Sequence, residues 1–209
     1  MKDNLYTLFY AAALGVVCAV LLTGVGHYLA PLREANAKAE EVRNILRVLG
    51  ITFDPKNSAQ DLVEVFEGKV RREPRGDLLV YLYMDTDKSD VVRAAAVPFS
   101  GQGLWGLVKG FLALEPDMRT IRGITFYEHE ETPGLGGEIA SSWFQDQFKG
   151  KSIEDAAGNP GIHMRIGGGA SAPNEVDGIT GATMTCEKVE KMLNLVIEKI
   201  SEKRSEHGQ

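Results

Sequence analysis

The sequence DGITGATMTCEKVEKMLNLVIEKI, residues 177–200, combines a glycine-rich turn with the pattern of an amphipathic helix. Gly178 and Gly181 allow a tight or left-handed backbone, and Ala182 adds almost no bulk beside them. Apolar residues then recur at helical spacing, at positions 189, 192, 193, 196, 197 and 200. The stretch therefore predicts an exposed turn that leads directly into the last helix of the chain.

Thr183 lies at the junction between this turn and the helix. Thr183 or Thr185 is expected to cap the helix, and the acidic Glu187 suits its first turn. The N-terminus of a helix offers free N–H donors and a partial positive charge, which favour a phosphate group. A reachable hydroxyl and an anion-binding helix end therefore coincide at Thr183. The simpler interpretation is a glycine-rich loop whose threonine only caps the helix.

A second glycine-rich stretch, ETPGLGG, occupies residues 131–137. Pro133 stiffens it, and its three glycines let a backbone approach a flat ligand closely. Leu135 could pack on one face of such a ligand while backbone N–H groups bond its polar edge. Thr132, Leu135 and Gly136 are therefore the residues expected to contact the ring of a ligand.

The acidic run Glu128-His129-Glu130-Glu131 precedes that stretch. No second histidine stands at helical spacing, and a charge run usually forms a solvated face. The two cysteines, Cys18 and Cys186, form no C-x-x-C pair, which argues against zinc or a Cys-ligated iron–sulfur cluster in this chain alone. No metal site and no catalytic residue is therefore expected.

The stretch GQGLWG at residues 101–106 matches the pattern G-x-G-x-x-G. A dinucleotide fingerprint would need a long helix directly after it and an acidic residue about 20 positions further on. Residues 110–115 read instead as a strand, and Pro116 follows. The sequence therefore favours a structural turn, or a loop that packs Trp105 against the domain, over an NAD site.

The N-terminal region is apolar. Leu5–Leu29 contains no Asp, Glu, Lys or Arg over 25 residues, which is long enough to span about 30 Å of hydrocarbon. The apolar core of a cleavable signal peptide is normally about 7–15 residues, so a retained single-span anchor is favoured over that alternative. Lys2 on one side and Arg33 and Lys38 on the other give little charge bias, so orientation is left open.

The remainder of the chain predicts an α+β fold with an antiparallel sheet and flanking helices. Three regions are expected: an anchor at 1–31, a helical stalk or linker at 32–57, and one domain at 58–209. Helices are predicted at 32–49, 58–66 (capped by Ser58) and 143–148, strands at 78–84, 91–99, 110–115, 121–127 and 162–166, and a turn at 85–90. The formal net charge of −6 argues against binding to nucleic acid.

Two of these motifs together resemble a known family. Asp-Gly-x-Thr-Gly-Ala-Thr at 177–183 and Glu-Thr-Pro-Gly-Leu-Gly at 131–136 are similar to the FMN-binding domain shared by the C subunit of the sodium-translocating NADH:quinone reductase and the G subunit of the Rnf complex. His129-Glu130 is as similar to the Rnf relatives as to the C subunit. Finer details are closer to the C subunit, namely residues 101–106, 125–128 and 136–139 with Trp143.

The resemblance implies that FMN is joined through its phosphate to Thr183 by a separate flavin transferase. It also implies a single-pass protein of the bacterial inner membrane whose FMN domain faces the periplasm. That domain would relay electrons among the other membrane subunits of a pump that oxidises NADH, reduces ubiquinone and moves Na+, with the NADH and quinone sites on other chains. The cofactor-binding residues are then expected to be Thr183, Asp177, Gly178, Thr180, Gly181, Ala182, Glu131, Thr132, Gly134, Leu135 and Gly136.

Asp177 is unusual in this set because a carboxylate beside a phosphate is repelled. We expect it to organise the glycine turn or to help hold Mg2+ during flavin transfer. Two other functions stay open: the G subunit of an Rnf-type ferredoxin:NAD+ oxidoreductase, and a membrane-tethered binding protein without a cofactor. A flavin absorption spectrum would separate the second of these from a flavoprotein.

Overall fold

The computed structural model describes residues 2–84 and 91–207. The turn predicted at 85–90 therefore lies outside the described residues. The chain divides into two compact units, Met1–Ala39 and Glu40–Gln209.

The first unit is formed by the N-terminal part of a single helix, α1 (Lys2–Val48). Its large apolar side chains are exposed, among them Phe9 and Leu22. By length and composition the helix could cross a membrane, and it continues through Pro31. The helix predicted for 32–49 is therefore confirmed as a continuation of the apolar segment.

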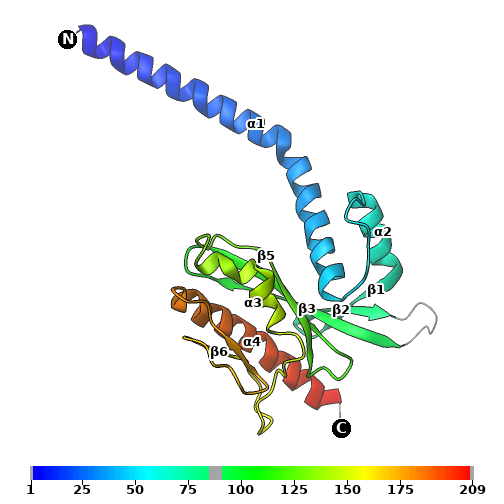
Figure 1. Ribbon diagram of the computed structural model, residues 1–209. Coiled ribbons are helices and arrows are strands. Elements are labelled where there is room, and N and C mark those ends of the chain that lie inside the picture. The colour runs from blue at the N-terminus through cyan, green and yellow to red at the C-terminus, as the bar shows by residue number, and fades with distance from the viewer. Residues whose placement is uncertain (1, 85–90, 208–209) are drawn as a thin grey trace. The chain divides into compact units, whose positions relative to one another are not determined.

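The second unit is built on an antiparallel sheet whose five strands follow one another in both sequence and space (Figure 1). This meander confirms the predicted α+β class with an antiparallel sheet. Its register places Tyr81 opposite Ala96, and Phe99 opposite Gly110. The strands are β1 (Val70–Arg75), β2 (Leu78–Met84), β3 (Val92–Gln102), β4 (Leu107–Leu114) and β5 (Ile121–Glu128).

Each face of the sheet has its own hydrophobic core, because alternate residues of a strand point to opposite faces. On β3, Val97 and Phe99 belong to one core, whereas Ala96 belongs to the other. The long helix α4 (Thr183–His207) closes the first core, and Figure 1 shows it running along the sheet. The second core is closed by α2 (Ala59–Lys69) and the end of α1.

The end of α1 is part of this second core. Ile45, Leu46 and Leu49 are almost fully buried there. The compact unit thus begins at Glu40, within the region 32–57 that the sequence assigns to a stalk or linker.

Helix α2 begins with a capping box, which confirms Ser58 as its cap. The Ser58 hydroxyl accepts a hydrogen bond from the Asp61 N–H at 3.3 Å, and the Asp61 carboxylate accepts one from the Ser58 N–H at 2.8 Å. Two backbone donors that the helix itself cannot satisfy are paired in this way.

Between β5 and α4 the chain forms short elements only. The helix predicted at 143–148 and the strand predicted at 162–166 are confirmed in shorter form, whereas β1, η1 and β7 were not predicted. These elements are η1 (Gly136–Ala140), α3 (Ser142–Asp146), β6 (His163–Arg165) and β7 (Glu175–Asp177). Strands β6 and β7 pair in parallel and form a separate two-stranded sheet.

The GQGLWG stretch forms the turn between β3 and β4, closed by a 2.8 Å bond from the Gly103 N–H to the Gly106 carbonyl. Strand β4 follows it directly, where a dinucleotide fingerprint would have a helix. The structural-turn interpretation is therefore confirmed. The packing expected of Trp105 is wrong, since its side chain is 67% exposed. The loop is held through its backbone instead of through the indole.

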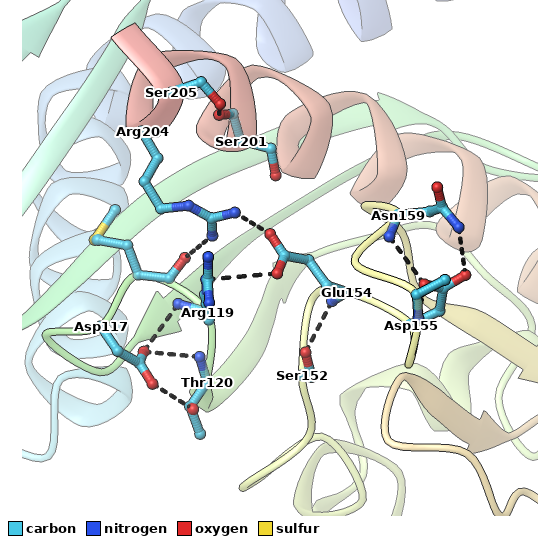
Figure 2. Close-up of polar contacts among 12 residues, drawn as sticks. Asp117, Arg119, Thr120, Ser152, Glu154, Asp155, Asn159, Ser201, Arg204 and Ser205 are labelled. Atoms are coloured by element: carbon cyan, nitrogen blue, oxygen red, sulfur yellow. Dashed lines mark hydrogen bonds and ion pairs between the residues drawn. The ribbon is translucent and has the colours of Figure 1, made fainter. Parts of the chain in front are cut away.

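A charged network around Glu154 ties the C-terminal part of α4 to the β4–β5 turn (Figure 2). Glu154 is 8% exposed; its carboxylate accepts a hydrogen bond from Arg204 and lies 3.5 Å from Nε of Arg119. Arg204 also donates to the Met118 carbonyl at 3.3 Å. Because the buried carboxylate faces two guanidinium groups, its charge is compensated, and loss of that charge leaves the arginines without their partner.

Glu154→Gln is therefore expected to lower the free energy of unfolding of the second unit by about 2 kcal/mol. Urea titration of the detergent-solubilised chain, followed by tryptophan fluorescence, measures this. Asp146→Asn is the matched control, because Asp146 pairs with Lys149 at 2.6 Å but both side chains are more than half exposed. That exposed pair should contribute less than about 0.5 kcal/mol. Equal unfolding midpoints for Glu154→Gln and Asp146→Asn would contradict the stabilising role of the Glu154 carboxylate.

Candidate cofactor site

The Asp-Gly-x-Thr-Gly-Ala-Thr motif leads into α4 as predicted, but the threonines do not cap the helix. Thr183 is the first residue of α4 and is exposed, so Ala182 occupies the flanking cap position. Thr185 instead donates its hydroxyl hydrogen bond to a side chain outside the helix, at Glu131. Gly181 has φ +79°, the left-handed conformation that the sequence predicts for this turn.

Glu131 is the residue on which the three glycine-containing motifs converge. It is 4% exposed, and its Oε1 accepts hydrogen bonds from the N–H groups of Leu104 (2.7 Å) and Trp105 (3.2 Å). Its Oε2 accepts the hydroxyl of Thr185, itself 1% exposed, at 2.7 Å. The expectation of a solvated face is therefore wrong for Glu131, because three donors compensate its burial. Glu130, next to it, is exposed.

The Glu-Thr-Pro-Gly-Leu-Gly stretch forms a tight turn around the carbonyl of Thr132. This carbonyl accepts hydrogen bonds from the N–H groups of Leu135 at 3.1 Å and Gly137 at 2.9 Å. Gly134 has φ +75° and open space around its missing side chain. Leu135 remains 44% exposed at the tip of the turn. The turn therefore presents an apolar side chain and accessible backbone, which a flat ligand needs.

Two glycines bring this turn against the start of α4. A Cβ atom on Gly181 would lie 3.1 Å from Cδ2 of Leu135, so the two motifs are in direct contact. A Cβ atom on Gly136 would lie 2.5 Å from Oγ1 of Thr185 and 2.6 Å from Oε2 of Glu131. Any side chain at Gly136 would therefore occupy the space of that buried hydrogen bond.

Asp177 lies at the end of β7, and its carboxylate is already engaged. Its Oδ1 accepts a hydrogen bond from the Ala170 N–H at 2.7 Å, at the end of the Gly167–Gly169 run. Its backbone N–H and carbonyl both bond the side-chain amide of Gln147, at 2.8 and 3.3 Å. The glycine segment that Asp177 organises is thus the 167–170 loop. Among the described residues no group of three or more His, Cys, Asp or Glu side chains is placed to hold a metal ion.

The rest of the 177–183 motif is a mixture of buried and exposed positions. The Gly178 N–H bonds the Arg165 carbonyl at 2.9 Å, and a Cβ there would lie 2.8 Å from Ile166. Thr180 is exposed, whereas Ala182 is 6% exposed and bonds the Ile179 carbonyl through its N–H at 3.1 Å. The motif therefore holds its backbone inward and presents its two threonines outward.

Cys186 helps to hold the turn of the candidate site, a role that the sequence did not predict. Its Sγ accepts a hydrogen bond from the Ile179 N–H at 3.2 Å, which ties the turn to the helix. Burial raises the pKa of this thiol, although the bond from Ile179 acts in the opposite direction. The helical pattern could have revealed both Thr185 and Cys186, since they precede the buried Val189 by four and three residues and so share its inward face.

Exposed apolar side chains occur on the segments around these motifs. They include Trp105 on the loop bound to Glu131, Met184 beside Thr183, and Trp143 on α3, which are 67%, 56% and 48% exposed. Exposed apolar side chains beside a candidate site are available to contact the ring of a ligand. The residues present thus fit a flat, phosphate-bearing ligand: apolar side chains and open backbone for its ring, and an exposed hydroxyl at a helix N-terminus for its phosphate.

The chain is similar in sequence to one known family of proteins. The FMN-binding domain family matches residues 103–198. The C subunit of the Na(+)-translocating NADH-quinone reductase of Vibrio anguillarum is 32% identical, over 88% of this chain and 86% of its own length. The corresponding protein of Haemophilus ducreyi is 29% identical, over 90% of this chain and 88% of its own length.

Two solved structures share the fold. The crystal structure of Shewanella oneidensis NqrC has a TM-score of 0.66 at 23% identity, covering 77% of this chain and 92% of its own. That of the C subunit from Parabacteroides distasonis has a TM-score of 0.64 at 24% identity, covering 80% and 92%. Since the sequence similarity extends along almost the whole of both the chain and its relatives, the chain belongs to the family of C subunits of the Na+-translocating NADH-quinone reductases.

Proposed function

We propose that this chain is the electron-carrier subunit of a Na+-translocating NADH:quinone reductase, with FMN held as a phosphoester on Oγ1 of Thr183. The observation that carries the proposal is the meeting of the two motifs. Leu135 contacts Gly181, and Thr183 stands exposed two residues further on, at the first position of α4. This contact supports the proposal, in which the ring site and the phosphate site would lie next to each other.

The helix N-terminus supports the phosphate part of the proposal. The first N–H groups of α4 lack intrahelical partners, and the helix dipole adds a partial positive charge there. The motif carboxylate that would repel a phosphate, Asp177, is turned to the Ala170 N–H. The simpler role of Thr183, a helix cap, does not apply because Ala182 precedes it at that position.

The attachment reaction can be balanced without any redox change. Thr183 Oγ1 forms the new bond to phosphorus and loses its proton, and a leaving group departs from the same phosphorus. A free phosphate monoester has no good leaving group, so the donor would be a phosphoanhydride such as FAD, which releases AMP. A separate flavin transferase would supply the catalytic groups. FMN, when bound, supplies the ability to accept electrons and pass them on.

The bond to Thr183 joins the phosphate end of FMN, far from its ring, so it anchors the cofactor and leaves its redox chemistry to the groups beside the ring. The chain's contribution there would come from Thr132, Leu135 and Gly136. The exposed Trp105, whose N–H bonds Glu131, and the exposed Trp143, seven residues after Gly136, are further candidates. Glu131 and Gly134 would support the turn that carries them. Gly178, Thr180, Gly181 and Ala182 would form the backbone around the attachment point.

The membrane arrangement is also part of the proposal. Residues 1–31 would form a single span in the bacterial inner membrane, 32–57 would connect it to the domain, and the FMN domain from 58 onward would face the periplasm. A cofactor outside the cytosol cannot readily be replaced from the internal flavin pool, which gives a reason for a covalent bond. The NADH and quinone sites would lie on the other membrane subunits.

Expression with and without the transferase tests the proposal. We expect flavin fluorescence that survives denaturing electrophoresis only when the transferase is present, and an intact mass raised by one FMN less water. Protease added to the outer face of the inner membrane should remove the flavin domain, if its orientation is as proposed. An unmodified mass after co-expression would contradict the covalent linkage, and complete protection from the protease would contradict the orientation.

A further inference from the structure

Thr183 and Thr185 lie on opposite sides of the first turn of α4. Successive residues of an α-helix are rotated by about 100°, so residues two apart are separated by about 200°. Their burial agrees with this, since Thr185 is 1% exposed and Thr183 is exposed. Any contact that holds Thr185 inward therefore directs Thr183 outward.

The first turn needs such a contact because a helix end is weakly held by its own hydrogen bonds. Two bonds from outside the helix hold it here. Thr185 donates its hydroxyl to Glu131 at 2.7 Å, and Cys186 accepts the Ile179 N–H at 3.2 Å. Only the first of these reaches a distant part of the chain, 54 residues away in sequence.

Glu131 is itself held in place by the β3–β4 turn. Its other carboxylate oxygen accepts the N–H groups of Leu104 and Trp105, at 2.7 and 3.2 Å. One buried carboxylate therefore joins the β3–β4 turn, the Glu-Thr-Pro-Gly-Leu-Gly turn that begins with Glu131, and the helix that carries the acceptor threonine.

We propose that Glu131 is a positioning residue for flavin attachment: by binding Thr185 it fixes the rotation of the first turn of α4, so that the Thr183 hydroxyl faces the flavin transferase. This inference rests on the proposed function of Thr183. Glu131 exchanges no proton with the acceptor and acts through Thr185. Both partners of the Glu131–Thr185 bond belong to this chain, so the proposed positioning needs no contact with the flavin.

The competing explanation is that the Glu131–Thr185 bond stabilises the domain and has no particular effect on Thr183. The two explanations differ for variants that are equally stable. Glu154→Gln serves as the control, because it is expected to weaken the domain at the far end of α4 while the first turn stays intact. If the Glu131–Thr185 bond only stabilises the domain, Thr185→Val and Glu154→Gln should slow flavin transfer to the same extent when they lower the free energy of unfolding equally.

Hydrogen–deuterium exchange of the unloaded, detergent-solubilised chain gives a readout that needs no flavin. The Cys186 N–H, which bonds the Ala182 carbonyl at 3.0 Å, reports on the first turn. Thr185→Val should accelerate exchange of the Cys186 N–H at least about fivefold, since it removes a bond to the Glu131 carboxylate without changing the side-chain volume. Thr185→Ser, which keeps the hydroxyl, and Glu154→Gln should leave exchange there within about twofold of wild type.

Flavin transfer to the same variants tests the functional consequence, with purified transferase and FAD. The transfer kcat/KM should fall about tenfold or more for Thr185→Val and stay within about twofold for Thr185→Ser and Glu154→Gln. Glu131→Gln should keep most of the rate, because its amide can accept from Leu104 and Trp105 and donate to Thr185. Glu131→Leu, which can do neither, should lose as much as Thr185→Val does.

The outcomes separate this inference from the proposed function. If the wild-type chain loads and Thr185→Val loads equally fast, the positioning role is refuted while Thr183 keeps its assignment. If Thr185→Val slows transfer only as much as Glu154→Gln does, the bond is merely stabilising and the positioning role is again refuted. If the wild-type chain takes no flavin from FAD and the transferase, the proposed function itself fails, together with the role of Glu131 in it.

Discussion

Replacing Thr183 with valine is expected to abolish covalent flavin completely. Valine has nearly the shape of threonine but lacks the oxygen that would bond to phosphorus, so no linkage can form at this position. The side chain is exposed and contributes no hydrogen bond to the fold among the described residues, so stability should change by less than about 0.5 kcal/mol. In-gel flavin fluorescence after co-expression with the transferase, together with intact mass, measures the loss.

Two matched variants show whether the effect belongs to this one hydroxyl. Thr183→Ser keeps an oxygen at the same site and should still load, although more slowly if the methyl group helps to orient it. Thr180→Val removes the other exposed threonine of the motif and should still acquire covalent flavin, because the linkage needs only the Thr183 hydroxyl. If Thr183→Val still carries covalent flavin, and the flavin disappears only when Thr180 is also replaced, the linkage forms at Thr180 and the assignment to Thr183 is wrong.

Periodic patterns in the sequence account for most of the fold. The spacing of apolar residues predicted α4, and its buried residues Val189, Leu193 and Ile197 confirm the predicted face. Ser58 at the start of α2 was predicted from local capping chemistry alone. The choice of the C subunit over the G subunit is also confirmed, since the chain belongs to the C-subunit family.

Elements that lack a periodic pattern could not be predicted in the same way. Strand β1 reads VRREPR and forms one edge of the sheet, where charged residues and Pro74 are tolerated because one side of the strand carries no partner strand. Strand β7 has three residues, too few for an alternating pattern to be visible. Its partner β6 runs parallel to it, so the two strands are not joined by a hairpin turn that the sequence could have indicated.

The candidate site was predicted in its parts but not in its connections. Both glycine motifs and the exposure of Thr183 followed from residue types, because glycine conformations and helix ends are local properties. The burial of Glu131 did not, since its partners Leu104 and Thr185 are 27 and 54 residues away. From the sequence alone, a carboxylate in a charged run is expected to be solvated, because the hydrogen-bond donors that compensate its burial are distant in sequence. Local sequence therefore indicated which motifs matter, and only the tertiary structure showed that one side chain connects them.

The largest effect on stability is expected at Gly110, in the middle of β4. Gly110 faces Phe99 on β3 and Phe126 on β5. The two phenyl rings meet edge to face across it, with centroids 5.4 Å apart and an interplanar angle of 73°. The missing side chain of Gly110 is what leaves room for this aromatic pair, which also packs beside Phe144 of α3 at 6.2 Å.

Gly110→Ala is therefore expected to lower the free energy of unfolding by more than about 3 kcal/mol, or to prevent folding. Its Cβ would overlap both the Phe99 ring and the Thr125 carbonyl, and neither a buried ring nor sheet backbone can move away cheaply. Gly123→Ala, on the neighbouring strand β5, is the control, since its Cβ would only touch Val48 at 3.7 Å. That change should be neutral or stabilising by up to about 1 kcal/mol.

Both tryptophans lie in the second unit, so urea unfolding followed by their fluorescence reports on this domain. A Gly110→Ala midpoint equal to that of Gly123→Ala would mean that Gly110 does not lie against the Phe99 ring and the Thr125 carbonyl as described.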